Sequence, residues 1–280
     1  MSGMLYLCAT PIGNLSDITF RVVETLKSVD LIAAEDTRIS VKLLNHFEIK
    51  TPMTSYHEHN KYEKGKHLVE RLEKGENIAL ITDAGTPGIS DPGEELVQLC
   101  YEKGIKVTSL PGAAACITAL SMSGQKTSRF AFEGFLSTEK KERKYILEEL
   151  KKETRTIIFY EAPHRLLKTL QLLKKELGNR KVSVCRELTK KYETVYQSTL
   201  EETITYYQEN PIKGECVIVL AGKGLLEIKK EEQEKWANLS LLEHMNIYLE
   251  AGIDKKEAMK KVAKDRGVSK GEVYRGLLEA

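Results

Sequence analysis

The sequence predicts an α/β protein with two domains, each a sheet flanked by helices, followed by a small helical region. Three observations lead to this fold class. The chain has 280 residues, a length typical of two domains. Its first part alternates short apolar runs with amphipathic stretches. In its middle part the order and spacing of the expected strands and helices change. Strand patterns then stop near Leu225, so we expect domains at residues 1–122 and 123–224 and a helical tail at 225–280.

The first domain reads as a series of strand–helix units. Such alternation predicts a mainly parallel sheet whose carboxyl-edge loops lie together and form the natural place for a ligand. The expected strands are residues 5–9, 31–34, 78–81 and 106–110, and the expected helices are 19–27, 40–47, 62–73 and 94–102.

The second domain is expected to be mixed α/β. The runs 181–186 and 194–198 have only a short polar link, which indicates antiparallel pairing. The boundary with the first domain is expected in the small and polar residues 121–128. The other expected strands are 130–135, 156–160 and 215–220, and the expected helices are 139–151 and 163–177.

The tail begins with a charge-rich link at 227–235 and continues as three helices. They are expected at 240–250 with Ser240 as a cap, at 254–266 and at 269–278, with Gly267 between the last two. A helix, a glycine turn and a basic helix resemble a helix-turn-helix outline, although an ordinary helical hairpin fits equally well.

Composition narrows the class of protein further. Hydrophobic residues make up 41% and charged residues 30%, a globular balance, and no apolar run approaches the length of a membrane span. The amino terminus shows no secretory pattern. The five cysteines are scattered without a Cys-x-x-Cys pair, which favours free, buried thiols and a cytoplasmic location.

The small net charge of +2 conceals two basic segments. Residues 165–191 contain nine Lys/Arg and two Glu, an excess of +7, and residues 254–275 contain eight Lys/Arg and four Asp/Glu, an excess of +4. Such segments indicate a nucleic-acid-binding face or, equally, solvated helix surfaces.

Three loops rich in glycine and proline follow expected strands: Thr10-Pro-Ile-Gly-Asn14, residues 82–93 and Pro111-Gly-Ala-Ala-Ala115. Glycine allows close backbone approach and proline stiffens the path, so together they predict a rigid, backbone-lined cleft that suits an adenosine-type ligand. The P-loop pattern is absent, and no Gly-x-Gly-x-x-Gly follows the first strand. Kinases, GTPases and simple dehydrogenases are therefore disfavoured.

Polar groups also gather at expected strand ends. Glu35-Asp-Thr-Arg38 predicts either a substrate clamp or an internal ion pair, and residues 159–165 and 186–190 occupy comparable places. His57 and His59 lack a third ligand, so no metal is expected. No nucleophile elbow or Cys/His pair supports covalent catalysis.

These motifs together resemble a known family. The segments 10–17, 34–38, 55–60, 82–93 and 159–165 are similar to the ribosomal RNA small-subunit methyltransferase I family, a branch of the tetrapyrrole-methylase superfamily, over about residues 4–222. The resemblance implies S-adenosylmethionine-dependent 2′-O-methylation of a cytidine in the decoding region of 16S rRNA. It also implies two α/β domains with the cofactor in the cleft between them, and a homodimer.

The resemblance also assigns residues to the cofactor. Thr82 and Tyr192 depart from the Ser and His common in this branch, and residues 111–115 lack a Ser often found there. The implied cofactor residues are Thr10, Pro11, Ile12, Gly13, Asp83, Ala84, Gly85, Thr86, Pro87, Gly112, Ala113, Ala114, Ala115 and Tyr160.

A general base could accept the ribose hydroxyl proton, and the sequence does not choose among its candidates. These candidates are Asp36, His57, Glu58, Glu161 and His164. Guanidinium and ammonium groups can bind RNA phosphates. The expected RNA-contacting residues are Arg38, Arg165, Lys174, Lys175, Arg180, Lys181 and Arg186. Two alternatives stay open, a tetrapyrrole C-methyltransferase acting on a precorrin or uroporphyrinogen and a non-catalytic RNA-binding protein.

Overall fold

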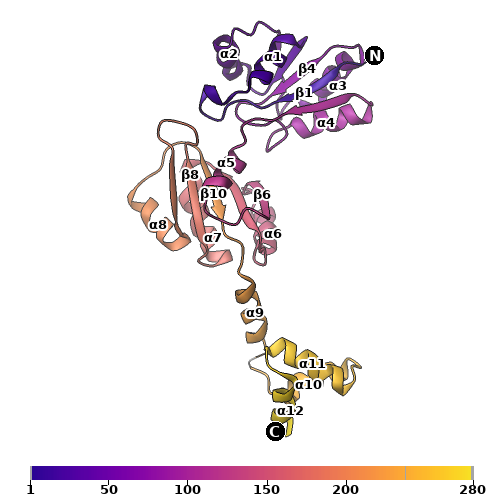
Figure 1. Ribbon diagram of the computed structural model, residues 1–280, viewed down its shortest axis with the longest axis vertical. Helices are drawn as coiled ribbons and strands as arrows, with labels where there is room; N and C mark the ends of the chain where they lie inside the picture. The colour runs from indigo at the N-terminus through magenta and orange to yellow at the C-terminus, as the bar shows by residue number, and fades with distance from the viewer. Residues whose placement is uncertain (1, 237, 279–280) are drawn as a thin grey trace. The chain divides into compact units, whose positions relative to one another are not determined.

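The computed structural model describes residues 2–236 and 238–278 and confirms the α/β class (Figure 1). The chain forms two compact units. The first comprises Met1–Leu147 and Arg155–Ala221 and carries both sheets. The second comprises Glu148–Thr154 and Gly222–Ala280 and is helical where it is described.

The first sheet is parallel, with strand order β3-β2-β4-β1-β5. Four of its strands lie within one residue of their expected bounds. The short β3 was not predicted, because Met-Thr-Ser carries no apolar run and is only partly buried. The strands are β1 (Met4–Cys8), β2 (Leu31–Ala34), β3 (Met53–Ser55), β4 (Ile78–Ile81) and β5 (Lys106–Leu110).

Helices cover both faces of this sheet, as Figure 1 shows. Because strand side chains alternate between faces, Leu5 packs with Leu68 and Leu96 while Cys8 packs with Leu26 and Leu44 on the opposite side. The elements on the first face are α3 (Lys61–Glu73) and α4 (Gly93–Glu102), and those on the second are α1 (Phe20–Ser28) and α2 (Thr37–His46), with the short turn η1 (Leu15–Asp17) before α1.

The start of α2 differs from the expectation by three residues. Asp36 is its N-cap, and the Asp36 side chain accepts a hydrogen bond from the Arg38 backbone N–H at 2.8 Å. This capping begins the helix at Thr37 rather than at Ser40, and it places Glu35 directly between β2 and the helix.

The winding of the first sheet reverses between β1 and β4, which are neighbours. The chain leaves β1 towards the β2 side of the sheet, whereas it leaves β4 towards β5 on the other side. Ligands of open α/β sheets bind at the carboxyl ends of the strands at such a reversal. The loops after β1 and β4 therefore flank the favoured ligand position.

The second sheet has the order β6-β7-β10-β8-β9. Its β6 and β7 are parallel, and the expected antiparallel pairing of residues 181–186 with 194–198 is confirmed by the β8–β9 register. The short link between these strands is the physical reason for this pairing. The strands are β6 (Phe130–Phe135), β7 (Thr156–Glu161), β8 (Lys181–Arg186), β9 (Thr194–Thr199) and β10 (Cys216–Leu220).

Helix α5 (Ala115–Met122) packs on one face of this second sheet. Its Cys116, Ala119 and Leu120 contact a cluster that includes Ile158 and Val217. The unit also contains α7 (Pro163–Leu177) and α8 (Leu200–Glu209), which pack together, and most of α6 (Lys140–Leu150), whose end falls in the second unit. Helix α8 was not predicted, although the capping box of Thr199 with Glu202 marks its start in the sequence.

The helical unit has its own core of Met245, Ala258, Val262, Ala263 and Val273. The expected link at 227–235 is largely a helix, because its charged residues form a solvent-exposed α9 rather than a loop. Its helices are α9 (Leu225–Glu234), α10 (Leu241–Glu250), α11 (Lys255–Arg266) and α12 (Lys270–Leu278). Gly267 ends α11 with a left-handed φ of 67°.

All five cysteines are free and buried, as expected. Within residues 2–236 and 238–278, no helix combines the length and apolar character required to span a lipid bilayer.

Candidate functional site

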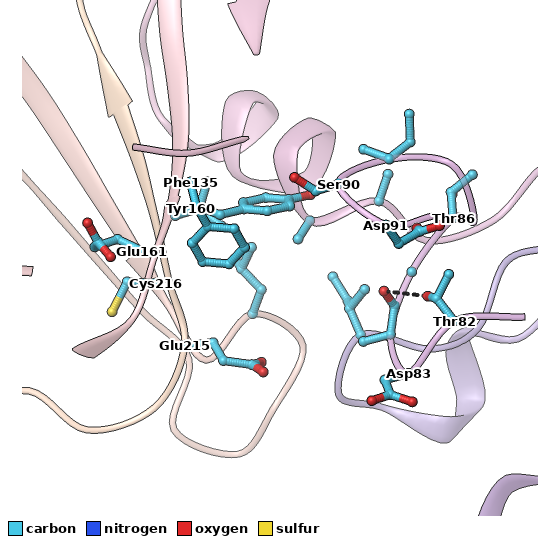
Figure 2. A pocket seen from close by; sticks show the side chains of 18 of the residues that line it. Thr82, Asp83, Thr86, Ser90, Asp91, Phe135, Tyr160, Glu161, Glu215 and Cys216 are labelled. Atoms are coloured by element: carbon cyan, nitrogen blue, oxygen red, sulfur yellow. Dashed lines mark hydrogen bonds between the residues drawn. The ribbon is translucent and has the colours of Figure 1, made fainter. Parts of the chain in front are cut away.

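A cavity of about 440 Å³ lies in the first unit, beside the reversal in strand order (Figure 2). Loops of the first sheet form one wall, and the start of α5 and strand ends of the second sheet form the other. The lining residues are Ile12, Glu35, Thr82, Asp83, Ala84, Gly85, Thr86, Ile89, Ser90, Asp91, Ala114, Ala115, Phe135, Tyr160, Glu161, Ala162, Pro163, Cys185, Leu188, Glu215, Cys216 and Val217.

Hydrogen bonds hold the three glycine- and proline-rich loops together. The Thr10 backbone N–H donates to Gly85 O at 2.9 Å, and the Gly85 N–H donates to Thr10 O at 3.1 Å. The Thr86 hydroxyl donates to Ala113 O at 2.9 Å. Gly85 has a φ of 91°, a conformation that glycine adopts without a steric cost. The loops after β1, β4 and β5 thus form one rigid, backbone-rich wall.

Tyr160 anchors an aromatic part of the opposite wall. Its phenolic oxygen accepts a hydrogen bond from the Cys116 backbone N–H at 3.2 Å, at the start of α5. Its ring meets Phe132 and Phe135 edge-on, with ring centroids 4.8 and 5.7 Å apart. Burial raises the pKa of Tyr160 well above its usual value, so the phenol keeps its proton.

The first-sheet wall is anionic. Glu35 Oε2 accepts a hydrogen bond from the Asp83 N–H at 3.2 Å, and Asp83 Oδ1 accepts one from the Asp36 N–H at 3.1 Å. Burial raises the pKa of Glu35; its bond to Asp83 lowers it in part, and the charges of Asp83, Asp91 and Asp36 raise it further. Burial also raises the pKa of Asp83. Such a wall favours a ligand that carries positive charge.

Asp91 fixes the shape of the long loop after β4. Its Oδ1 accepts hydrogen bonds from the Gly88 N–H at 2.8 Å and the Gly93 N–H at 2.9 Å. Between them, Ser90 has a φ of 68°, unusual for a residue with a side chain. This arrangement presents Ser90 and Asp91 to the cavity.

The structure brings many of the expected cofactor residues together. Those that line the cavity are Ile12, Asp83, Ala84, Gly85, Thr86, Ala114, Ala115 and Tyr160. The others lie just outside it: Thr10, Pro11, Gly13, Pro87, Gly112 and Ala113. Two of these are close-packing positions, since a Cβ on Gly112 would lie 2.5 Å from Ala9 Cβ and one on Gly13 2.9 Å from Leu188 O.

Only Glu161 among the five candidate bases lines the cavity. The Asp36 carboxylate forms an ion pair with Arg38 at 2.6 Å, and hydrogen bonds from Arg38 lower its pKa to about 2. The motif at 35–38 is thus an internal ion pair. Glu58 pairs with Lys61 at 2.7 Å, and His57 and His164 lie outside the lining.

The Glu161 carboxylate is fully engaged within the protein. Its Oε1 accepts from the Ala162 N–H at 2.9 Å and lies 3.2 Å from Arg165 Nε. Its Oε2 accepts from the Thr169 hydroxyl at 2.5 Å. With both oxygens occupied, Glu161 is tied to the start of α7.

Some of the expected RNA-contacting cations are engaged by other groups of the protein, and the rest are exposed. Arg180 departs from the expectation, because it is only 7% exposed and its Nε donates to Leu177 O at 3.0 Å. Arg165 and Arg186 donate to backbone carbonyl oxygens, those of Leu136 and Lys213. Lys174 pairs with Glu201 at 2.8 Å. Lys175, Lys181 and Arg38 are exposed.

Several lining residues are not among those that the sequence assigned to the cofactor, the base or the RNA. Glu35, Ser90 and Asp91 lie in motifs that were singled out, yet only the loop geometry shows which side chains face the cavity. The others come from strands of the second sheet or from residues next to them, and the mixed topology of that sheet provides no rule for where its strand ends meet. They are Phe135, Cys185, Leu188, Glu215, Cys216 and Val217. Among the described residues, no three His, Cys, Asp or Glu side chains are grouped to hold a metal ion.

Comparisons with known proteins agree with this architecture. The family model of Tetrapyrrole (Corrin/Porphyrin) Methylases matches residues 4–204. Diphthine synthase is similar in structure, with a TM-score of 0.64 at 14% identity over 78% of this chain and 90% of the other. Uroporphyrin-III-C-methyltransferase from Thermus thermophilus has a TM-score of 0.56 at 15% identity over 82% and 98%. At these identities the likeness concerns the fold.

Relatives found by sequence have much higher identities to this chain than these solved structures. Ribosomal RNA small subunit methyltransferase I of Bacillus subtilis (strain 168) is 52% identical over 97% of this chain and 93% of its own. The protein of that name from Synechocystis sp. is 48% identical over 99% and 98%. The resemblance found in the motifs is therefore confirmed. The chain belongs to the tetrapyrrole methylase family and, within it, to the ribosomal RNA small subunit methyltransferase I proteins.

Proposed function

We propose that this enzyme transfers the methyl group of S-adenosylmethionine to the 2′-hydroxyl of a cytidine in the decoding region of 16S rRNA. One observation carries the proposal: a backbone-rich cavity with an anionic wall lies at the strand reversal of a chain 52% identical to proteins named ribosomal RNA small subunit methyltransferase I.

The cavity suits this cofactor in size and chemistry. Its volume of about 440 Å³ falls within the range of small-molecule sites. The carboxylates of Asp83 and Asp91, in the loop after β4, complement a positively charged sulfonium. Ile12, Leu188, Val217 and the alanines at the start of α5 offer an apolar surface to an adenosine. We assign the cofactor to the lining residues of the loops after β1, β4 and β5 together with Tyr160.

The protein's contribution is chiefly to position the reactants. When bound, the cofactor supplies an activated methyl group on positively charged sulfur. The loop after β4 is held rigid by the Asp91 and Thr86 hydrogen bonds, so it can fix a ligand without reorganising. Tyr160, kept protonated by burial, ties the start of α5 to the second sheet and so holds the second wall together.

The RNA partner is supported by the exposed cations Lys175, Lys181 and Arg38 and by the basic helices of the second unit. Binding that relies on such cations is salt-dependent. A homodimer and a cytoplasmic location belong to the same proposal. The five free thiols support a reducing compartment. The mass of the protein in solution, measured by light scattering, tests the dimer.

Two measurements test the function. Calorimetry should detect S-adenosylmethionine binding to the purified protein. Incubation with methyl-labelled cofactor and either 30S subunits, free 16S rRNA or a precorrin, followed by mapping of the label, should place it on a cytidine ribose. A label on the precorrin alone, or no cofactor binding, would overturn the proposal.

A matched pair of variants localises the binding. Ala115→Leu places a larger side chain at the cavity wall and should weaken cofactor binding at least ~10-fold by filling ligand space. Ser121→Leu, on the exposed side of the same helix, should leave the affinity unchanged. Equal affinities for both variants would place the cofactor elsewhere.

A further inference from the structure

We propose that Glu35 is the catalytic base that accepts the proton of the methyl-acceptor hydroxyl. The inference rests on the proposed function and deepens it, since it names a residue of the same cavity that was not among the candidate bases. Glu35 directly follows β2, where its backbone N–H donates to Ile81 O at 3.3 Å, so its position is set by the sheet rather than by a mobile loop.

Two carboxylates of the cavity, Glu161 and Glu215, are less suited than Glu35 to act as the base. Among the described residues, the carboxylates that line the cavity are Glu35, Asp83, Asp91, Glu161 and Glu215. Both oxygens of Glu161 are engaged by protein donors. Glu215 has a side chain that is 79% exposed, and its Oε2 pairs with Lys190 at 3.1 Å. Neither group is arranged to accept a proton inside the cavity.

The two aspartates hold the wall in shape. Asp91 Oδ1 accepts from two backbone N–H groups that define the loop after β4. Asp83 Oδ1 accepts from the Asp36 N–H, and the positive charge of Arg38 acts on the Asp83 carboxylate. In Figure 2 the Asp83 carboxylate lies apart from Tyr160 and Ser90. Both aspartates therefore support the wall through one carboxylate oxygen. The charge of Arg38 also lowers the pKa of Asp83, whereas only the Asp83 hydrogen bond lowers that of Glu35.

Glu35 combines a fixed oxygen with a free one. The Asp83 N–H holds Oε2, while Oε1 makes no hydrogen bond to any residue that the structure describes. The neighbouring cation, Arg38, forms a bidentate ion pair with Asp36 and not with Glu35. Glu35 thus offers one unshared oxygen on a side chain whose orientation is already set.

The surroundings also make Glu35 a stronger base than an ordinary carboxylate. Burial and the charges of Asp83, Asp91 and Asp36 raise its pKa, and a base gains strength as its pKa approaches the working pH. In the reaction, the ribose oxygen forms a bond to the methyl carbon as the sulfur–methyl bond breaks and its electron pair returns to sulfur. The hydroxyl proton passes to Glu35 Oε1 and is later released to solvent.

The test compares Glu35→Gln, which keeps the shape but cannot accept the proton, with Glu35→Asp and with Glu73→Gln. Glu73 is an exposed carboxylate at the end of α3 and serves as the control. Single-turnover methylation of the RNA substrate is followed from pH 5 to 8. Calorimetry measures cofactor affinity, and thermal unfolding verifies that each variant is folded.

We expect Glu35→Gln to bind the cofactor like the wild type and to methylate at least ~100-fold more slowly. The wild-type rate should fall as the pH drops through the raised pKa of Glu35, and this pH dependence should vanish in Glu35→Gln. Glu35→Asp should recover part of the rate, and Glu73→Gln should match the wild type. Nuclear magnetic resonance of carboxyl-labelled glutamate, with no cofactor added, should show a Glu35 pKa above the ordinary value.

Three results would overturn the inference. They are an unchanged rate and pH profile in Glu35→Gln, a loss of cofactor affinity that accounts for its lower rate, or an ordinary Glu35 pKa. A wild-type protein that binds no cofactor or methylates no RNA would instead refute the proposed function, and the inference with it.

Discussion

Thr10 and Gly85 exchange two backbone hydrogen bonds, of 2.9 and 3.1 Å, across the point where the winding of the first sheet reverses. The pair fastens the loop after β1 to the loop after β4. The Thr10 hydroxyl adds a third bond, to Thr82 O at 3.2 Å. The proposed cofactor wall is therefore fixed before any ligand arrives, which lowers the entropic cost of binding.

Gly85→Ala tests this wall. The left-handed φ of 91° should make alanine cost about 1 kcal/mol or more of unfolding free energy. The new Cβ would also lie 3.4 Å from Ile12 Cγ2 and 3.6 Å from Ala113 O, so cofactor affinity should fall. Chemical denaturation and calorimetry measure the two effects.

Gly104→Ala is the matched control for that variant. Gly104 also has a left-handed φ, of 65°, but a Cβ there meets nothing within 4 Å. It should lose a similar amount of stability and keep its cofactor affinity. An equal loss of affinity in both variants would show that general destabilisation, and not the wall, is responsible.

Much of the fold could be predicted because it depends on local pattern. Buried strands such as β4 and β10 are continuous apolar runs with sharp ends, and the caps at Ser240 and Asp254 mark helix starts. Among the elements that were not predicted, two have a clear physical reason. β3 is held by pairing with β2 rather than by its own pattern, and α9 is a charged surface helix whose composition resembles a link.

The site was less predictable, because its selectivity arises from contacts between distant residues. The sequence pointed to the loop of residues 82–93 and to Tyr160. It could not show that Arg38 forms its ion pair with Asp36, so that one oxygen of Glu35 makes no hydrogen bond. Nor could it show that Glu161 is engaged by Thr169, eight residues later, or that Arg180 is buried. Each of these outcomes depends on side-chain geometry in the folded protein.

Glu161→Gln should destabilise the protein without removing the chemistry. Glu161 is 2% exposed and accepts hydrogen bonds from Thr169 and Ala162, and bonds to a charged group are worth about 1.5–3 kcal/mol each. We therefore expect a loss of about 2 kcal/mol in unfolding free energy and a near-wild-type methylation rate per folded molecule. Glu209→Gln, at an exposed site on α8, is the control. A rate loss as large as that of Glu35→Gln would make Glu161 the base instead.

Joint replacement of Lys175 and Lys181 by Gln should weaken the salt dependence of RNA binding. Both side chains are exposed, and each phosphate contact contributes about 0.7 to the slope of log affinity against log salt for single-stranded RNA. The slope should therefore fall by about 1.4. The exposed pair Lys66, on α3, and Lys103, directly after α4, should not change it when replaced in the same way. An identical slope for both double variants would remove Lys175 and Lys181 from the RNA surface.

His244 should make the helical unit less stable in mild acid. The imidazole is fully buried and stacked on Trp236 with ring centroids 3.9 Å apart. Its Nδ1 accepts a hydrogen bond from Arg266 Nε at 3.1 Å, so Nε2 carries the proton and faces Asp265 Oδ2 at 3.3 Å. Burial and the charge of Arg266 lower the pKa of His244, and the Asp265 carboxylate, which also accepts a bond from Tyr248, only partly opposes them.

The direction of the pH effect follows from this lowered pKa. Below about pH 6.5 the unfolded chain binds a proton at His244 that the folded unit resists, so stability falls with pH by up to about 1.4 kcal/mol per unit. Trp236, the only tryptophan, reports unfolding of this unit by fluorescence between pH 7 and 5, where few carboxylates titrate. His244→Phe keeps an aromatic ring against Trp236 and should flatten the profile, whereas His46→Asn, at an exposed site in the first unit, should not. A wild-type profile already flat over this range would contradict the lowered pKa.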